Sequence, residues 1–430
     1  MKFDRFFLRG RMMMADAGGQ GGNMVATTQN FVNAYTGAAT PFDAANTMSP
    51  EMKTYYNTEA LENARPNHVF TQFAKNIALP ENHGLTVEVR KANTFPDVRR
   101  LTEGVIPDGR QFGYSAIHMT VYQYGDYAAL SDRLDLRAVD PVAQDMAEEM
   151  GAAGGNTKDK LSRNIALSGS NVMYCPKSNG TAVTTRSALD ATCLLTPTVV
   201  NRAATWLKKH RAPKINGDYV AIIHPSVAYD LRQSDGWLDV HKYAQPEEIY
   251  NGEIGKLHGV RFVESDNAKV FKGSALVNGT LTVASDVDNS VTIPVTGVTL
   301  TANALANRYV LIGGMKAKVV SNTTNALTID YPLTVDAGAT IVPGEGGANN
   351  CAVYACIFLG KDAFGVIDAE GGNMEMILKD KKQAGGPLEQ FSTIGLKMET
   401  GGGVLYQERI LRVECGSFYS DVDTDEDSVA

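Results

Sequence analysis

Histidine is the side chain best suited to acid–base chemistry near neutral pH, so the seven histidines of this sequence are the first candidates for a catalytic role. They are His68, His83, His118, His210, His224, His241 and His258. No two of them stand in the His-x3-His spacing, with an acid between, that places two zinc ligands on one face of a helix. The sequence therefore predicts no helical histidine metal site.

Two of these histidines lie where an enzyme could use them. His224 follows a predicted buried strand, the place where α/β enzymes often carry catalytic groups, and His241 has Asp239, Glu247 and Glu248 nearby. A simpler interpretation is a hydrogen-bonded turn histidine at 224 and a solvated charged surface around 241. Because no third convergent group accompanies either histidine, the catalytic interpretation lacks support.

The remaining reactive side chains form no known motif. GEIGKL at 252–257 has the wrong spacing for a phosphate-binding loop, and LSGSN at 167–171 lacks the second glycine of a nucleophile elbow. The cysteines never approach zinc spacing, and their odd number predicts free thiols in a reducing compartment. They are Cys175, Cys193, Cys351, Cys356 and Cys415. We predict no catalytic residue, no cofactor and no metal ligand.

Composition narrows the class of protein. The 430 residues are 43% apolar and 20% charged, which allows two or three domains with a buried core. A net charge of −8 disfavours a protein whose main role is to bind nucleic acid. No apolar run reaches the length of a membrane span. Arg9 and Arg11 interrupt the apolar start, so we expect no export signal.

The first half of the chain predicts an arm, a hairpin and a long helix. Residues 1–66 contain a glycine-rich stretch that cannot build a core, and they resemble an arm. LTVEVRK at 85–91 and SAIHMTVYQY at 115–124 alternate apolar and polar residues, which predicts a hairpin over 85–124 with a long polar tip. Asp140 and Pro141 can begin a helix over 140–167, whose internal glycines indicate a break or a close approach to neighbouring backbone.

The second half changes character twice. From residue 196 the pattern is α/β, and residues 267–349 then become rich in Val, Thr, Gly and Asn with few aromatics. Strand-like runs flank that block, so we predict a small inserted β domain. Strand patterns return at 374–379, 392–399 and 404–414. The acidic tail at 418–430 is expected to be solvated and mobile.

Three extended stretches carry a resemblance to a known family. They are DGWLDVHKYAQPEEIYNGEIGKLHGVRFVES at 235–265, VYQYGDYAALSDRLD at 121–135 and GPLEQFSTIGLKMETGGGVLYQERILRVE at 386–414. In this order they resemble major capsid proteins of tailed bacteriophages with the Hong Kong 97-type fold, in the branch named for coliphage N-four. Outside the arm and the 267–349 insertion, the resemblance covers most of the chain.

The resemblance implies an α+β subunit with a defined layout. Residues 1–66 would be the N-terminal arm, and 67–128 the segment that carries the extended loop. Residues 129–174 and 361–417 would form the peripheral domain around a spine helix, and 175–266 with 350–360 the axial domain. The inserted β domain at 267–349 and the acidic tail at 418–430 complete the chain. Within 235–265, Trp237, Tyr243 and Tyr250 would pack helical turns, Gly252, Gly255 and Gly259 would permit turns, and His241 and His258 would be structural.

The implied function is self-assembly, as pentamers and hexamers, into the icosahedral shell around the double-stranded DNA of a tailed phage. The implied partners are other copies of the chain, with portal, scaffold and cement proteins as further candidates and no membrane. The implied location is the virion, after assembly in the host bacterial cytoplasm. Four cations among the first 11 residues suit either weak contact with packaged DNA or docking on an acidic neighbour. The residues are Lys2, Arg5, Arg9 and Arg11.

Two alternatives and three further expectations complete the sequence analysis. An intracellular hydrolase would use His224 or His241, and an adhesin would be suggested only by the composition of 267–349. Lys91 lies where some relatives form covalent cross-links, although a lone lysine is commonly a solvated charge. We expect the insertion to be removable. We also expect a neighbouring subunit to cover the apolar face of the hairpin. That face comprises Leu85, Val87, Val89, Ile117, Met119 and Val121.

Overall fold

The computed structural model describes residues 24–25, 69–80, 84–93, 95, 97–101, 103–104, 106, 108–132, 142–234, 255–274, 277, 279–369, 374–381 and 390–425. Apart from 24–25, the expected arm lies outside these residues, as do the expected helix cap at Asp140 and Pro141 and most of the 235–265 stretch. The chain divides into two compact units, which are described separately. The first comprises 1–68, 122–159 and 368–400, and the second 69–121, 160–367 and 401–430.

The first unit combines one long helix with antiparallel strands. Helix α5 (Val142–Leu167) contributes its first part to this unit, and β18 (Glu375–Lys379) pairs antiparallel with β19 (Phe391–Val404). A short strand β1 (Met24–Val25) pairs in parallel with β4 (Tyr114–Ser131). The small core between helix and strands consists of Ala147, Met376, Leu378 and Ile394.

Helix α5 continues through its internal glycines because one of them allows a close approach. A Cβ atom on Gly154 would lie 2.8 Å from both the Leu396 Cδ2 and the Met374 Sδ atoms. A side chain at this position would require the Leu396 and Met374 side chains to shift. The helix is unbroken through these glycines, so the expected break is wrong, and the close approach at Gly154 is to the side chains of Leu396 and Met374 rather than to neighbouring backbone.

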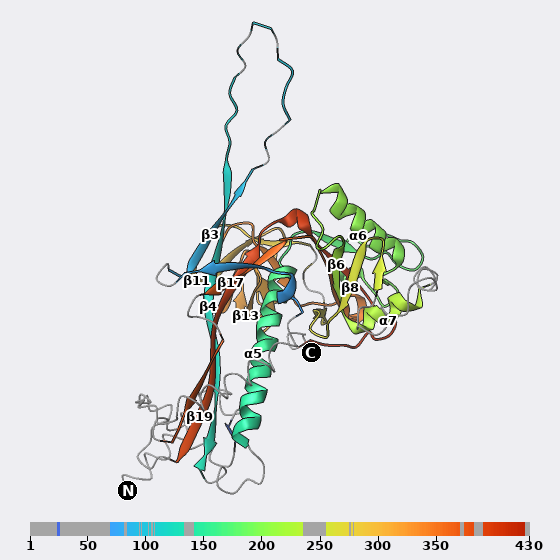
Figure 1. Ribbon diagram of the computed structural model, residues 1–430. Coiled ribbons are helices and arrows are strands. Elements are labelled where there is room, and N and C mark those ends of the chain that lie inside the picture. Colours follow the sequence, from blue (N-terminus) through green and yellow to red (C-terminus); the bar gives the residue numbers. More distant parts are fainter. Residues whose placement is uncertain are drawn as a thin grey trace. The chain divides into compact units, whose positions relative to one another are not determined.

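The second unit is built on a mixed sheet in the order β5-β20-β16-β6-β8-β7, with β9 added to β16. Its strands are β5 (Val172–Tyr174), β6 (Tyr219–Ile223), β7 (Gly255–Leu257), β8 (Val260–Glu264), β9 (Val270–Phe271), β16 (Val353–Leu359) and β20 (Ile410–Cys415). Every residue of β6 and β16 is buried. Helices α6 (Pro197–Lys209) and α7 (Pro225–Gln233) belong to the same region (Figure 1). The parallel β6–β8 pair, with α7 between them in sequence, accounts for the α/β pattern seen after residue 196.

One strand lies in a different place from the sequence expectation. The run at 404–414 was expected to complete the peripheral domain with the other late strands. Instead, β20 pairs antiparallel with β16 and parallel with β5, so it belongs to the mixed sheet of the second unit. Alternation of apolar residues identifies a strand without identifying its partner.

The hairpin expected over 85–124 is present. Strand β3 (Thr86–Ala92) pairs antiparallel with β4, from Thr86 opposite Thr120 to Ala92 opposite Tyr114. Figure 1 shows the chain drawn out beyond the ends of these two strands into a long tip. At the other end of the hairpin, β2 (Lys75–Leu79), β17 (Phe364–Ala369) and the last residues of β19 continue the sheet of β4.

The inserted β domain expected at 267–349 corresponds to a closed six-stranded barrel in the order β10-β11-β14-β13-β12-β15. Its strands are β10 (Leu281–Val283), β11 (Val287–Thr296), β12 (Tyr309–Ile312), β13 (Met315–Asn322), β14 (Ala326–Val335) and β15 (Thr340–Pro343). Gly313 and Gly314, both at positive φ, form the two-residue turn between β12 and β13. Strand β9, near the start of the expected insertion, pairs with β16 of the mixed sheet.

Short 3₁₀ helices connect these elements at Thr71–Phe73, Arg186–Ala188, Ala348–Asn350 and Gln407–Arg409. Of the tail from 418 onward, residues 418–425 are described: several side chains are exposed, as expected, while Asp423 and the backbone bond to the mixed sheet and its helices. Across the described residues, no helix is both long and apolar enough to cross a membrane.

Candidate functional site

His224 is the first position at which the structure can be tested for chemistry. It precedes α7, and its Nδ1 atom accepts a hydrogen bond from the backbone N–H of Ser226 at 3.2 Å. The Ser226 hydroxyl donates to Asp423 Oδ2 at 2.8 Å rather than to the histidine. A serine, a histidine and an aspartate therefore lie together, but without the serine–histidine bond that activates a nucleophile.

The charges around His224 agree with a structural role. Burial lowers the pKa of His224, and the nearby Asp423 carboxylate only partly offsets this. For Asp423, burial raises the pKa, but hydrogen bonds from Ser420, Tyr354 and Ser226 outweigh burial and leave the pKa below its ordinary value. The His224 ring also lies 5.0 Å from the Tyr354 ring, centroid to centroid. These contacts make His224 a capping residue for α7, as the simpler interpretation predicted.

His241 and its neighbouring acids lie outside the described residues, so the structure does not test them. Among the residues that the structure does describe, no cluster of three or more His, Cys, Asp or Glu side chains could hold a metal ion. All five cysteines are free and buried, as the sequence predicted. Hydrogen bonds from the thiols of Cys175 and Cys356 lower the pKa of Cys415. None of these three side chains reaches solvent, so a substrate could not contact their thiols.

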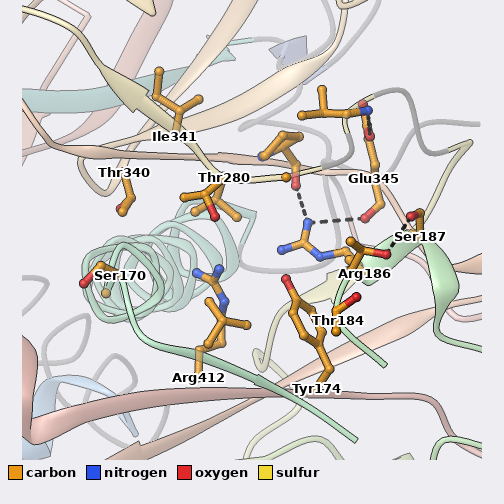
Figure 2. A pocket seen from close by; sticks show the side chains of 18 residues that line it. Ser170, Tyr174, Thr184, Arg186, Ser187, Thr280, Thr340, Ile341, Glu345 and Arg412 are labelled. Atoms are coloured by element: carbon orange, nitrogen blue, oxygen red, sulfur yellow. Dashed lines mark hydrogen bonds between the residues drawn. The ribbon is translucent and has the colours of Figure 1, made fainter. Parts of the chain in front are cut away.

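A cavity of about 230 Å³ lies between the barrel and the mixed sheet of the second unit. Figure 2 shows the guanidinium groups of Arg186 and Arg412 pointing into it near the Tyr174 hydroxyl. Arg186 comes from a 3₁₀ helix and Arg412 from β20, while Thr340 and Pro343 come from β15 of the barrel. The cavity is therefore lined by both the barrel and the sheet that carries it.

The charged groups of this cavity are already paired. Arg186 donates two hydrogen bonds to the Glu414 carboxylate, at 2.6 and 2.7 Å, and Arg412 donates a third at 2.9 Å. Glu414 is fully buried. Burial alone would raise the pKa of its carboxyl, but the two guanidinium groups outweigh burial and leave this pKa below its ordinary value, so the carboxylate is ionised. This is a complete buried ion network.

The same two arginines join separate elements through backbone oxygens. Arg186 donates to the Pro343 carbonyl at 2.7 Å, at the end of the barrel strand β15. Arg412 donates to the Leu167 carbonyl, and Thr340 to the Ser168 carbonyl, at the C-terminal end of α5. A cation at that end also suits the helix dipole. The network fastens barrel, helix and sheet together, and its side chains include no nucleophile paired with a base.

The strongest candidate for a functional surface is the tip of the hairpin, defined as residues 93–114. Its large apolar side chains are exposed although they lie close together in sequence. They are Phe95, Val98, Leu101, Ile106, Phe112 and Tyr114, with Val98 94% and Ile106 93% exposed. Apolar side chains gathered on one exposed segment indicate a surface that binds another molecule.

Hydrogen bonds and ring contacts give the hairpin tip a defined structure. The two chains of the tip are joined by Arg110, which donates to the Asp97 carbonyl at 3.0 Å, and by Arg99, which donates to the Asp108 carbonyl. The Phe112 ring meets the Tyr114 ring edge-on at 5.1 Å. The apolar side chains are therefore displayed on a braced ribbon.

The base of the hairpin is covered by its own chain, which corrects the expectation for its apolar face. Met119 and Val121 are buried at 2% and 4% exposure. A Cβ on Gly403 would lie 3.0 Å from the Met119 Cγ atom, so β19 packs directly on this face. Leu85 is exposed, and Val87, Val89 and Ile117 are half-buried. Met119 is therefore buried without a neighbouring subunit.

A charged contact supports the hairpin further along. Lys91 Nζ lies 3.2 Å from Glu408 Oε2 and 4.7 Å from the centre of the Tyr406 ring. The sequence left Lys91 as either a solvated charge or a cross-linking residue, and the structure places it in an ion pair within its own chain. Beyond Lys91, the side-chain hydrogen bonds of the described residues stay within the hairpin.

The sequence predicts the tip but not its apolar surface, because the apolar residues of the tip have no periodicity. They are separated by prolines, glycines and charges, a pattern that predicts a long polar loop. The available signal was composition: five large apolar side chains within 95–106, where a solvated loop needs none.

The sequence and the fold are both similar to those of known proteins. A family model described as phage capsid protein matches residues 126–381. The structure is similar to the capsid of the cyanophage P-SCSP1u, with a TM-score of 0.50 and 14% identity over 81% of this chain and 88% of that chain. It is also similar to the capsid asymmetric unit of the cyanophage Pam1, with a TM-score of 0.50 and 12% identity over 90% of this chain and 98% of that chain. Among curated proteins, none matches.

Proposed function

The chain belongs to the phage capsid protein family and is a major capsid protein that forms a phage shell, and we propose that its copies join through the hairpin tip. The fold is of the Hong Kong 97 type. The observation that carries the proposal is the exposure of Val98 and Ile106 on a braced hairpin whose base is packed on its own subunit.

The energetic argument favours a second copy of the chain as the partner. Full burial of a side chain such as valine or isoleucine contributes about 1.5–3 kcal/mol. A shell repeats the same contact in every subunit, so even a modest contribution per copy stabilises the whole particle. The exposed Arg99, Arg100 and Arg110 beside the apolar residues give the tip a charged rim, as interfaces between proteins commonly have.

The finer layout is part of the proposal. Copies would assemble as pentamers and hexamers into an icosahedral shell around double-stranded DNA. Residues 175–266 and 350–360 would surround the symmetry axes, with β20 as an additional strand of that axial domain. The remainder of 129–174 and 361–417 would form the peripheral domain. Residues 1–66 would be the arm, and 67–128 the segment carrying the extended loop.

The partners and location follow from the same proposal. The subunit would contact other copies of itself, with portal, scaffold and cement proteins as further partners, and the arm would touch packaged DNA weakly. It would act in the virion after assembly in the bacterial cytoplasm. The branch named for coliphage N-four, and the absence of enzymatic activity, are proposed on the sequence resemblance and the family.

The test is a double substitution at the tip, Val98→Asp with Ile106→Asp. We expect a soluble subunit whose melting temperature is close to that of the native chain, because neither side chain is buried within it. We expect negative-stain electron microscopy to show no closed shells, because the aspartates would have to be buried without a partner at each contact.

Val98→Thr with Ile106→Thr is the matched control, because it keeps the branched shape and adds no charge. It should assemble with reduced yield. Closed shells of normal yield from the aspartate variant would show that the tip is not the contact, while a large loss of melting temperature would show that it packs within its own chain.

A further inference from the structure

The chain after β20 follows the surface of the second unit through contacts spaced a few residues apart. We name residues 417–425 the strap. The Ser417 hydroxyl and the Phe418 N–H both donate to Asp230 Oδ2, at 2.7 and 2.8 Å. The Ala352 N–H then donates to the Asp421 carbonyl at 2.9 Å. The strap is therefore attached from its first residues and continues along the end of β16.

The middle of the strap is held by an aspartate side chain. Asp423 Oδ2 accepts hydrogen bonds from the Tyr354 hydroxyl at 2.6 Å and the Ser226 hydroxyl at 2.8 Å. Its Oδ1 atom accepts from the Ser420 hydroxyl at 2.6 Å. The Tyr354 hydroxyl oxygen also lies 3.0 Å from the Ser420 carbonyl oxygen. An acidic residue that looks solvated in the sequence is thus bound by β16 and α7.

The end of the strap reaches two buried cations. Asp425 Oδ2 lies 3.0 Å from Arg163 Nη1 and 3.0 Å from Lys269 Nζ. The Arg163 and Lys269 side chains are only 3% and 2% exposed. Arg163 comes from α5 and Lys269 directly precedes β9, so one carboxylate joins two distant parts of the fold.

The physical chemistry of this contact is that of a binding site. A buried cation needs an anionic partner, because desolvation penalises its charged form. The orientation of Arg163 is fixed independently of the strap: it donates to Asn164 Oδ1 at 3.1 and 3.0 Å and to the Asn267 carbonyl at 2.9 Å. The site is therefore shaped to receive a carboxylate oxygen.

We propose that Arg163 and Lys269 form a carboxylate-binding socket whose ligand is the acidic C-terminal end of the same chain. Docking of Asp425 in this socket closes the strap over α7, β9 and β16 as the subunit folds. The ligand class is an aspartate carboxylate on an extended peptide. The proposal concerns folding within one subunit, and it stands whether or not the hairpin tip joins subunits.

The occupant is the chain's own tail because the strap is continuous. It runs from Cys415 at the end of β20 to Asp425, with the Asp230, Ala352 and Tyr354 contacts along the way. A tail supplied by a second copy would make the melting temperature depend on protein concentration. A tail from the same chain leaves it independent of concentration.

The first test compares two substitutions in the full chain. Asp425→Asn should lower the melting temperature by several degrees, because it leaves Arg163 and Lys269 without the carboxylate. Asp421→Asn is the matched control: the exposed Asp421 is engaged through its carbonyl oxygen, so this variant should melt like the native chain. Equal melting of both variants and the native chain would overturn the proposal.

A double substitution separates the socket from a general loss of stability. Adding Lys269→Met to Asp425→Asn removes one of the two cations that Asp425 contacts. The double variant should melt at a higher temperature than the sum of the two single effects predicts. Strictly additive effects would show that Asp425 and Lys269 do not interact, and would also contradict the proposal.

The second test supplies the strap in trans. A chain ending at Gly416 should bind a fluorescent peptide of residues 417–430 in an anisotropy titration, and should lose at least tenfold in affinity for the same peptide carrying Asn at position 425. Equal affinity for both peptides would overturn the socket. If the shortened chain does not fold, the full-chain melting comparison decides, because it needs no truncation.

Discussion

The barrel and the hairpin tip both extend from the second unit, and they differ in how they treat their apolar side chains: the barrel buries them, and the tip exposes them. The barrel returns its last strand, β15, to its first, β10, so that no open strand edge is left. The hairpin has only two strands and continues past them as a tip. Closure makes the first excursion self-sufficient, whereas the second leaves its apolar residues for another molecule.

The exposed fractions of the side chains show this difference between the barrel and the tip. Ile293 and Leu327 in the barrel are fully buried, whereas Val98 and Ile106 in the tip are almost fully exposed. Both segments contain β-branched and aliphatic residues, so composition does not distinguish them. What distinguishes them is whether the strands can pair into a closed ring. In a capsid subunit, the open excursion is the one that suits assembly.

The largest expected effect divides the hairpin itself. Met119→Asp would place a charge at the buried base, against Gly403 and β19. We expect it to destabilise the subunit by about 4 kcal/mol or more, because an unpaired buried charge is among the costliest substitutions. Urea unfolding of the soluble subunit measures this loss. Val98→Asp at the tip should leave the urea midpoint unchanged.

The two results together locate the boundary between the subunit and its interface. If Met119→Asp unfolded at the native urea concentration, the base of the hairpin would not be part of the subunit core. The distinction between base and tip would then fail.

That boundary could not be found from the sequence. Periodicity at 85–91 and 115–124 identified both strands, because alternation depends only on local residues. The cover over Met119 comes from Gly403, far along the chain, and close approach of a glycine leaves no local signal. The sequence therefore predicted the hairpin correctly, whereas the expectation that a neighbour covers its apolar face is wrong for Met119 and Val121 and stays a prediction for the rest of that face.

The second prediction removes the barrel. The segments entering and leaving it run side by side, since the Lys272 N–H donates to the Gly344 carbonyl and the Gly346 N–H to the Gly273 carbonyl. Replacing residues 275–343 by a short Asn-Gly turn should therefore leave a soluble, folded subunit. Circular dichroism and the melting temperature measure the outcome.

The excision should still carry a moderate cost. Leu311 and Val342 of the barrel belong to the main core, and Gly314 packs against Ile165 of α5. Uncovering these few side chains would destabilise the subunit by about 2–4 kcal/mol. Replacing only the barrel turn 323–325 by a longer glycine loop is the control, and it should melt like the native chain. Recovery of only unfolded chain after excision would make the barrel part of the folding core.

Long-range pairing also explains the other differences between sequence and structure. The helix over 140–167 was predicted well, and α5 occupies Val142–Leu167, because its pattern is local. The partners of β20 and of the strap were not predicted. An acidic tail without bases looks solvated until Arg163 and Lys269, distant in sequence, are found buried beside it. Charge patterns show which residues are ionised and leave their partners open.

The smallest expected effect concerns the one ion pair described between the hairpin and the barrel region. His118 Nδ1 lies 3.2 Å from Asp336 Oδ2, and both side chains are about half exposed, at 47% and 49%. Exposed pairs of this kind contribute about 0.2–1 kcal/mol. A double-mutant cycle with His118→Gln and Asp336→Asn should therefore give a coupling free energy below about 1 kcal/mol in urea unfolding. Shell formation should be unaffected, because the hairpin is already fixed by Met119 at its base and by Lys91 and Glu408 further along. A coupling free energy of several kcal/mol, or loss of shells in either single variant, would mean that the barrel holds the hairpin in position. The barrel and the hairpin would then not be independent of each other.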